Sequence, residues 1–178
     1  TKSAESRPSR HAPEPCQLAP SESVRQAAPD LFVHCGDTIY GDQPLVAERT
    51  LDDGSVWRNL MTPAKSKVAE TLDEFRGAHL YNRLDDHYRR FAAEVGLVAM
   101  WDDHEVYNDF AGQTVDPDRY AFGRQAFLEY FPIQDDDLPV DAECAGNPLF
   151  RIFSWGKDVE ISILDGRSCR SPSAASAS

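Results

Sequence analysis

The segment Leu97–Val106 constrains the fold most, because an apolar run of strand length is followed directly by three carboxylates around a histidine. The apolar run predicts a buried strand. Four adjacent ionisable side chains cannot all be buried without partners, because each desolvated charge costs several kcal/mol. The end of this strand therefore predicts a site that holds a cation. The alternative is a solvated loop in which Asp102 or Asp103 caps a following helix.

A second segment has the same design. Asp30–Cys35 predicts another buried strand, and Gly36 after it permits a sharp turn that presents Asp37. A long loop and then helical stretches lie between the two strands, which predicts a parallel pair joined by a right-handed crossover. The carboxyl ends of parallel strands meet at one edge of an α/β sheet. We therefore expect Asp37 to lie beside the acidic cluster that follows Trp101.

Further helices and hairpins are expected around this pair. Thr71 followed by Glu74 is typical of a helix start, and four residues at helical spacing are expected to share one face of that helix: Leu72, Phe75, His79 and Leu80. A small hairpin is expected around Asp52-Asp53-Gly54 within the long loop 38–63. Other helices are expected over Ser21–Ala28, Leu84–Val95 and Arg119–Phe131, and an antiparallel pair of strands over Leu149–Trp155 and Val159–Leu164.

Composition limits the classes of partner. The 178 residues are 41% hydrophobic, which is enough for one domain with a core, placed at residues 21–170. The formal net charge of -12 argues against a surface that binds nucleic acid or anionic membranes, because such partners are repelled at long range. No apolar run is long enough to span a membrane, and no apolar signal segment precedes the domain.

The ends of the chain have a different composition. The leader, residues 1–20, holds four prolines and no apolar periodicity, and the tail, residues 171–178, is of low complexity. We expect the leader to be disordered or misfitted to the domain and the tail to be disordered. The four cysteines are too few and too scattered for a disulfide scaffold, so they leave the compartment undecided.

Metal chemistry is the function that the two strand ends favour. An aspartate at the tip of a glycine turn can bridge two metal ions that activate water for phosphoester hydrolysis, and Asp37 is that candidate. Asp103 is placed as a ligand of the second metal. Tyr40, three residues after Asp37, is in reach of the same ion as a phenolate if that ion is ferric. Oxygen donors suit hard cations such as calcium, magnesium or manganese.

Three further side chains are candidates for chemistry on the substrate. His104 is placed to contact the phosphoryl group or to protonate the departing alkoxide, with Glu105 holding the imidazole. The alternative for His104 is a hydrogen-bonded structural histidine. Arg167, after the last strand, can clamp a phosphate through its planar fork, and an ordinary surface ion pair is the alternative for it.

Several separate motifs resemble one family. GDTIY follows an apolar strand, WDDHEVYND follows the second, and between them lie AETLDEFRGAHLYNRLDD and RRFAAEV. Together they resemble the alkaline phosphatase D family, the PhoD-like branch of the calcineurin-like metallophosphoesterases, over roughly residues 29–170. The late segment ILDGRS is similar to a family segment written LDTRS.

The resemblance implies a fold, a reaction and a set of ligands. It implies an α/β fold, a partial αββα metallophosphoesterase-like sandwich with mixed sheets and flanking helices, and hydrolysis of phosphomonoesters or phosphodiesters at a binuclear site of iron and calcium. By position, Asp37 and Tyr40 match the family's GDxxY metal ligands. Asp103 and His104 match its WDDHE ligand and catalytic histidine.

The sequence also departs from the family pattern. Members supply a ligand from a first strand, for which this chain offers only Cys16 in a proline-rich segment, and they supply further ligands from a GDxHN-like motif beyond the equivalent of Arg167. We therefore expect a truncated domain with weakened metal affinity. The alternative to an active phosphoesterase is an inactive fragment of the family that acts as a weak cation-binding or interaction module.

Two expectations concern partners and compartment. A truncated domain would expose unpaired sheet edges, which are templates for self-association. The compartment stays open, because family members are often exported and this chain shows no signal peptide.

Overall fold

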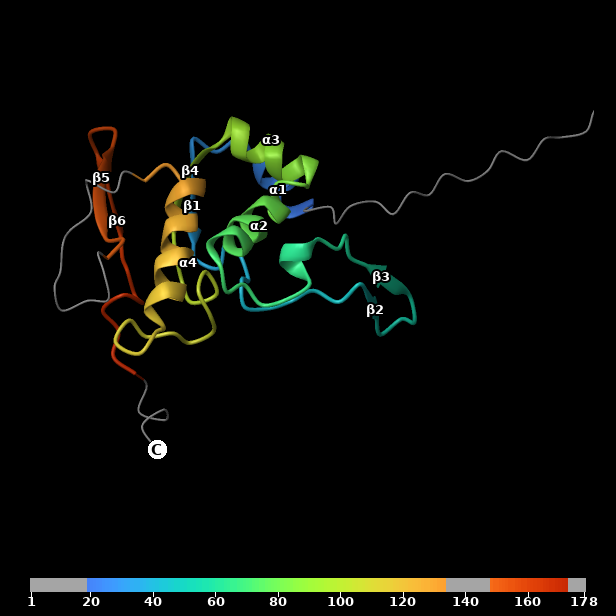
Figure 1. The fold of residues 1–178 in the computed structure, drawn as a ribbon. Helices are drawn as coiled ribbons and strands as arrows, with labels where there is room; N and C mark the ends of the chain where they lie inside the picture. Colours follow the sequence, from blue (N-terminus) through green and yellow to red (C-terminus); the bar gives the residue numbers. More distant parts are fainter. Residues whose placement is uncertain (1–18, 134–147, 173–178) are drawn as a thin grey trace, which may run out of the picture.

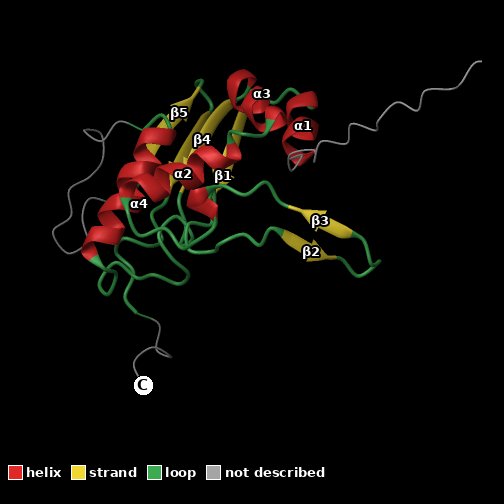
Figure 2. Cartoon of the chain, turned by 45° about the vertical axis from the view of Figure 1, so that its right-hand side comes forward, coloured by secondary structure: helices red, strands yellow, loops and turns green. Residues whose placement is uncertain are grey.

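Two parallel strands, β1 (Leu31–Cys35) and β4 (Gly96–Met100), form the sheet around which the chain is arranged. The structure is a computed structural model that describes residues 19–133 and 148–172. The strands pair in register over their whole length, so both end at the same edge, and Figure 2 shows them side by side. This pairing confirms the parallel arrangement that the sequence predicted.

Helices fill the connections on either side of this pair (Figure 1). The first helix, α1, packs against α3, and α2 packs against both α4 and the 3-10 helix η1. Their bounds are α1 (Ala19–Gln26), η1 (Pro63–Lys65), α2 (Leu72–Asn82), α3 (Asp86–Glu94) and α4 (Pro117–Tyr130). The predicted helices are therefore confirmed, with α1 beginning two residues before the expected start at Ser21.

Acidic side chains fix where two of these helices begin. The Glu74 carboxylate accepts the N–H of Thr71 at 3.1 Å, so the expected capping pair forms at the start of α2. Asp116 accepts the N–H of Arg119 at 2.9 Å at the start of α4. Each bond satisfies an N–H group that has no partner inside the helix, so these caps set the first turn locally.

The apolar core lies between α4 and the segment that follows β4. Trp101 is 1% exposed and packs edge-on against Phe110 and Tyr120. Its indole N–H donates to Asp165 at 3.0 Å. The same cluster holds further buried side chains: Ala99, Val106, Val115, Phe127, Phe131 and Leu149. The residue before the acidic cluster is therefore anchored in the core, as close packing requires of so large a side chain.

Two antiparallel hairpins complete the described strands. The strand β2 (Glu48–Thr50) pairs with β3 (Val56–Arg58), and this hairpin stands away from the helices in Figures 1 and 2. The strand β5 (Arg151–Trp155) pairs with β6 (Val159–Ile163). Both hairpins confirm sequence predictions, and each sheet in the described ranges has two strands.

One side chain departs from its expected place. Leu80 is 52% exposed, so the four-residue face predicted for α2 is wrong at that position, whereas Phe75 and His79 are buried. Helical spacing alone cannot place a residue at the margin of a face, because the neighbouring helix decides how wide the contact is. Residues 1–18 of the leader, residues 134–147 and residues 173–178 of the tail lie outside the described residues.

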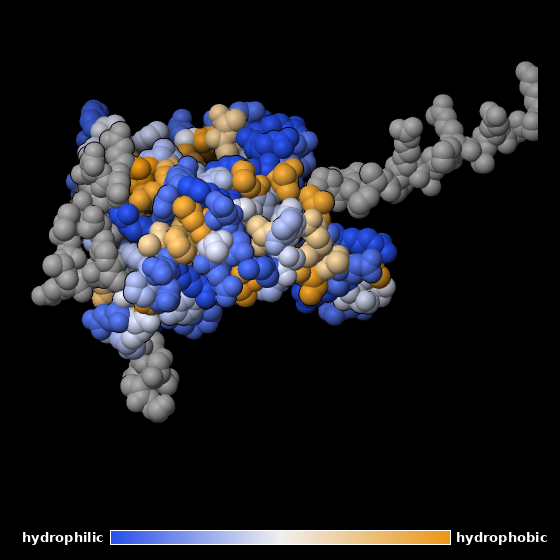
Figure 3. Space-filling model, in the orientation of Figure 1, coloured by the Kyte–Doolittle hydropathy of each residue, from blue (hydrophilic) through white to orange (hydrophobic). Residues whose placement is uncertain are grey.

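Apolar side chains are exposed along and beside the β2–β3 hairpin. They are Val46, Leu51, Val56, Trp57, Leu60 and Met61, and Figure 3 shows apolar surface at this side of the molecule. Self-association stays a prediction that such surface favours.

In the ranges that the structure describes, no helix is both long and apolar enough to cross a bilayer. Cys35 is an exposed free thiol and Cys169 is disulfide-bonded.

His79 makes stability depend on pH. Its imidazole is 2% exposed and stacks on Tyr130 with ring centroids 4.8 Å apart. Burial, assisted by the charge of Arg83, lowers the pKa of His79 from 6.5 to about 3. Between these values the unfolded chain binds a proton that the folded chain does not bind. The free energy of unfolding therefore falls as the pH falls through this range.

We expect His79→Phe to remove this dependence, because phenylalanine fills the same place without a group that titrates. Below about pH 6, the parent should lose roughly 1.4 kcal/mol of unfolding free energy per pH unit relative to the variant. Urea unfolding at about pH 6.5, 5.5 and 4.5 measures the difference. Leu80→Phe, on the exposed face of the same helix, should keep the parent slope, and equal slopes for parent and His79→Phe would contradict the assignment.

Candidate functional site

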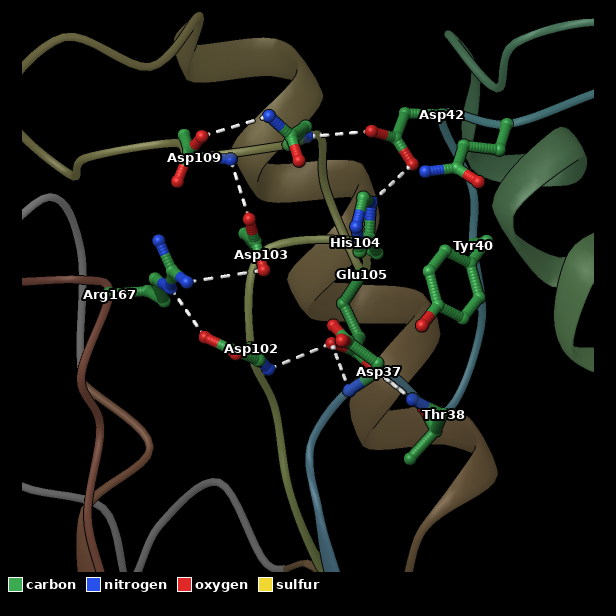
Figure 4. Close-up of polar contacts among 12 residues, drawn as sticks. Asp37, Thr38, Tyr40, Asp42, Asp102, Asp103, His104, Glu105, Asp109 and Arg167 are labelled. Carbon is green, nitrogen blue, oxygen red and sulfur yellow. Dashed lines mark hydrogen bonds and ion pairs between the residues drawn. The ribbon is translucent and has the colours of Figure 1, made fainter.

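A glycine turn brings the loops after β1 and β4 into contact (Figure 4). Gly36 has φ +98° and Asp37 has φ +52°, so the chain reverses direction sharply after β1. A Cβ on Gly36 would lie 2.6 Å from the Cβ of Asp102, closer than side-chain carbons approach one another. Only glycine allows both the backbone angle and this approach. The expected convergence of the two strand ends is therefore confirmed.

The buried carboxylate of Glu105 ties these loops together. Glu105 is 0% exposed. One of its oxygens accepts the N–H groups of Asp37 (3.2 Å) and Asp102 (2.8 Å), and the other accepts the N–H and the hydroxyl of Thr38. Burial raises the pKa of Glu105, whereas the bonds from Thr38 and Asp102 oppose this shift. These four hydrogen bonds stabilise the ionised form of the carboxylate.

The imidazole of His104 is held by Asp42. The Nδ1 atom of His104 lies 2.8 Å from Asp42 Oδ1, and the other oxygen of Asp42 accepts the N–H of Asn108 at 2.6 Å. The expectation that Glu105 holds the imidazole is therefore wrong, because both oxygens of Glu105 accept hydrogen bonds from the two loops. Asp42 is not among the site residues that the sequence predicts. Its position in GDTIYGD, five residues after Asp37, is the sequence feature that could have indicated a place in the site.

This contact fixes the tautomer of the neutral histidine and favours its protonated form. A carboxylate only accepts, so Nδ1 carries a proton and Nε2 remains for other partners. Burial lowers the pKa of His104, but the hydrogen bond to Asp42 and the charges of Asp42, Asp103 and Asp37 outweigh it, and the net pKa lies above the ordinary value.

Asp37 has a carboxylate oxygen without a partner. Its Oδ1 is buried and accepts no hydrogen bond. Burial, together with the charges of Asp102 and Asp103, raises the pKa of Asp37, although His104 opposes the shift. A buried carboxylate oxygen with no donor is costly in the protein alone. A cation at this place would remove that cost.

Asp103 faces the same place from the other loop. One of its oxygens accepts the N–H of Asp109 at 2.6 Å, and the other lies 3.2 Å from Arg167 Nη2. Burial raises the pKa of Asp103, but the backbone N–H of Asp109 and the charge of Arg167 outweigh it, so the net pKa is lowered. Ligand atoms of Asp37, Asp103 and His104 all lie within 4.8 Å of one another. The donor set, two carboxylates and an imidazole, fits a metal ion.

Tyr40 lies at the margin of this cluster. Its ring centroid is 4.4 Å from that of His104, and its side chain is 44% exposed. Burial and then the charge of Asp37, with smaller contributions from other carboxylates, raise the pKa of the phenol. Without a cation the phenol therefore stays protonated. Its role as a metal ligand stays a prediction.

Arg167 is buried beside the cluster. It is 9% exposed, its Nε donates to Asp102, and its Nη2 pairs with Asp103. The alternative of an ordinary surface ion pair is therefore wrong. Its Nη1 is buried without a hydrogen-bond partner. Asp165 accepts the backbone N–H of Arg167 at 3.0 Å, so the arginine is held at its main chain as well. Cys16 lies outside the described residues.

The family follows from comparison with known proteins. A family model described as PhoD-like phosphatase matches residues 17–178. The chain belongs to the PhoD-like phosphatase family. Alkaline phosphatase D of Bacillus subtilis (strain 168) is 32% identical to this PhoD-like chain over 149 residues. A solved structure described as the structure of PhoD matches the fold with a TM-score of 0.68 at 28% identity.

These matches cover most of the chain but only part of each relative. The aligned region is 79% of this PhoD-like chain and 24% of the Bacillus protein. For the solved structure the shares are 86% and 29%. The chain thus spans about a quarter of the length of its curated relative. The family and its α/β fold are shown, and the expectation of a phosphatase lineage is confirmed.

We expect Glu105→Gln to destabilise the protein. The amide puts an N–H₂ group where the carboxylate accepts backbone N–H groups, so at least one donor loses its partner in a dry place. The free energy of unfolding should fall by about 2 to 4 kcal/mol in urea titrations. Glu160→Gln, on the exposed side of β6, is the matched control and should stay within about 0.5 kcal/mol of the parent. A Glu105→Gln protein as stable as the control would contradict this role.

We expect Asp42→Asn to lower the pKa of His104, because it removes the carboxylate that stabilises the imidazolium. Titration of the His104 ring signals by NMR, with a chelator present, measures the shift. Asp52→Asn, in the exposed β2–β3 turn, should leave the His104 titration unchanged. Identical titrations for Asp42→Asn and the control would show that Asp42 does not set the charge of the ring.

Proposed function

We propose that this chain carries part of the active site of a metal-dependent phosphoester hydrolase. The observation that carries the proposal is the meeting of Asp37, Asp103 and His104 at the end of the parallel strands, with Asp37 Oδ1 buried and unpartnered. Membership of the PhoD-like phosphatase family supports it. A divalent or trivalent cation, with iron and calcium as first candidates by family resemblance, is the ligand that this donor set requires.

The metal ligands would be Asp37 and Asp103, with Tyr40 completing the set from the margin and Asp37 bridging if two ions bind. Bound metal supplies an activated water and neutralises charge on the phosphoryl group. The chain's part is to hold these carboxylates at fixed places. The bonds that Glu105 accepts from both loops do this without using either ligand side chain.

His104 would give a proton to the departing oxygen. Its Nδ1 is held by Asp42, so the ring presents Nε2 to the cluster. The raised pKa keeps a larger fraction of the ring protonated near neutral pH, which suits a general acid. Glu105 then acts as a positioning residue, because it contacts the loops and not the ring.

Arg167 would bind the phosphoryl group through Nη1, the guanidinium nitrogen that has no hydrogen-bond partner. Two of its nitrogens are committed to Asp102 and Asp103, whereas Nη1 is buried without a partner. A single charge-assisted N–H fits one phosphoryl oxygen, so the contact would be single and not bidentate. Substrate binding would therefore depend on the cation more than on Arg167.

The second candidate is a cation-binding module without turnover. It is favoured by one observation: within the described ranges, a single cluster offers three donors of the type that hold metal. Catalytic binuclear sites generally use more ligands than this to fix two ions. Both candidates predict metal binding, and only the first predicts hydrolysis.

We expect Asp37→Asn to abolish hydrolysis and to weaken metal binding. The protein is stripped with a chelator, supplied with calcium and iron, and analysed for metal content and for release of aryl alcohol from a bis-aryl phosphate. Turnover should fall by at least about a hundredfold in the variant, because the amide lacks the negative charge that holds the cation.

Asp52→Asn, which changes an exposed aspartate of the β2–β3 turn, is the matched control and should keep both metal and turnover. Stoichiometric metal that depends on Asp37, with no turnover from any metal tested, would favour the cation-binding module. Turnover that survives in Asp37→Asn would sink the proposed site.

A further inference from the structure

Lys65 is a buried lysine that the proposed reaction does not use. It is the last residue of η1 and is 6% exposed. Its Nζ donates to the main-chain carbonyls of Tyr40 (2.5 Å) and Gln43 (3.0 Å). Burial lowers the pKa of Lys65, while the nearby charge of Asp42 opposes the shift. A lysine is rarely enclosed in this way without a specific partner, and here the partner is a turn of the main chain.

The two carbonyls stand at the ends of one turn. Gln43 N–H donates to the Tyr40 carbonyl at 3.4 Å, so residues 40–43 form a closed turn. Lys65 clasps this turn by donating hydrogen bonds to both of its ends. The turn carries two side chains that contact His104. The Tyr40 ring stacks near the imidazole, and Asp42 Oδ1 lies 2.8 Å from Nδ1. The buried Lys65 side chain thus binds the main chain at both ends of the turn that makes these contacts.

Other bonds hold the middle of the turn. Gly41 N–H donates to the His104 carbonyl at 2.9 Å, and the Gly41 carbonyl accepts the N–H of Ala69 at 2.8 Å. These bonds hold the middle of the turn in place. The orientation of the peptide planes at its two ends depends on the Lys65 side chain. Without its Nζ, both carbonyl oxygens would lose a charged donor, and the Tyr40 carbonyl would keep only the 3.4 Å bond from the Gln43 N–H. The turn would then rotate to recover solvent.

We propose that Lys65 is a positioning residue whose ammonium group, by clasping residues 40–43, sets Tyr40 and Asp42 against His104. Its effect on turnover rests on the proposed function, whereas its effect on the place of His104 does not. Among the hydrogen bonds of the described residues, the Lys65 Nζ donates only to backbone oxygens. Lys65 would therefore position His104 through the turn.

The test compares Lys65→Met with Lys67→Met in the full chain. Methionine keeps the length and apolar stem of the side chain and removes the donor. Lys67 is an exposed lysine two residues away, and its Nζ pairs with Glu74 at 2.7 Å. The main readout is the NMR signal of the proton on His104 Nδ1, assigned by its loss in Asp42→Asn. We expect Lys65→Met to lose or broaden this signal and Lys67→Met to keep it.

Hydrolysis of the bis-aryl phosphate is the second readout. We expect kcat to fall by about tenfold or more in Lys65→Met with a smaller change in KM, because misplaced groups slow the chemical step more than binding. If the parent shows no turnover with any metal, the proposed function fails, and the NMR comparison still decides the role of Lys65.

One result would overturn the inference. If Lys65→Met keeps the His104 signal at its parent position, Lys65 does not position the ring, whatever the variant loses in unfolding free energy. Should Lys65→Met fail to fold, Lys65→Leu also removes the donor and keeps an apolar side chain of smaller volume. A displaced or weakened His104 signal in Lys65→Leu supports the proposal, and an unchanged signal overturns it.

Discussion

The fold of the site depends on one buried carboxylate. Glu105 follows the acidic cluster of the second strand, yet its oxygens accept from the backbone of the first loop as well as from its own. Fully enclosed charges are tolerated only where hydrogen bonds replace water, and four donors do so here. Because three of the four bonds come from main-chain N–H groups and the fourth from the Thr38 hydroxyl, the side chains of Asp37 and Asp103 remain available. Gly36 completes this arrangement by letting the loops approach closely.

A second level of contacts holds the side chains that face the cluster. Asp42 orients His104, Asp102 and Asp103 hold Arg167, and a lysine from η1 clasps the turn that carries Asp42. Negative groups outnumber positive ones at this edge, and one oxygen of Asp37 is left without a donor. That imbalance supports the proposal of a cation at this place. Burial and the charges of Asp102 and Asp103 raise the pKa of Asp37, so ionisation of this carboxyl is costly in the protein alone.

Family membership and site geometry support the same chemistry from independent directions. The family model matches residues 17–178, and the solved PhoD structure matches the fold at a TM-score of 0.68. The chain aligns with about a quarter of the curated relative, so the activity of that whole protein is a proposal for this one. Within the described residues, the geometry contributes what family membership cannot: which oxygen of Asp37 lacks a donor, and which nitrogen of His104 is held by Asp42.

The sequence by itself determined the strands, the helices that connect them, and the presence of Asp37 and Asp103 at adjacent strand ends. Those features follow from local periodicity, a glycine turn and the rule that parallel strands end at one edge. The partners of the site were decided only by the tertiary structure. Asp42 and His104 are 62 residues apart, Arg167 and Asp102 are 65 apart, and Lys65 reaches Tyr40 across 25. No local pattern specifies such pairs, because a buried polar group takes whichever donor or acceptor packing brings within reach. For the same reason Leu80 had the spacing of a core residue and became exposed, since the width of a buried face is set by the neighbouring helix.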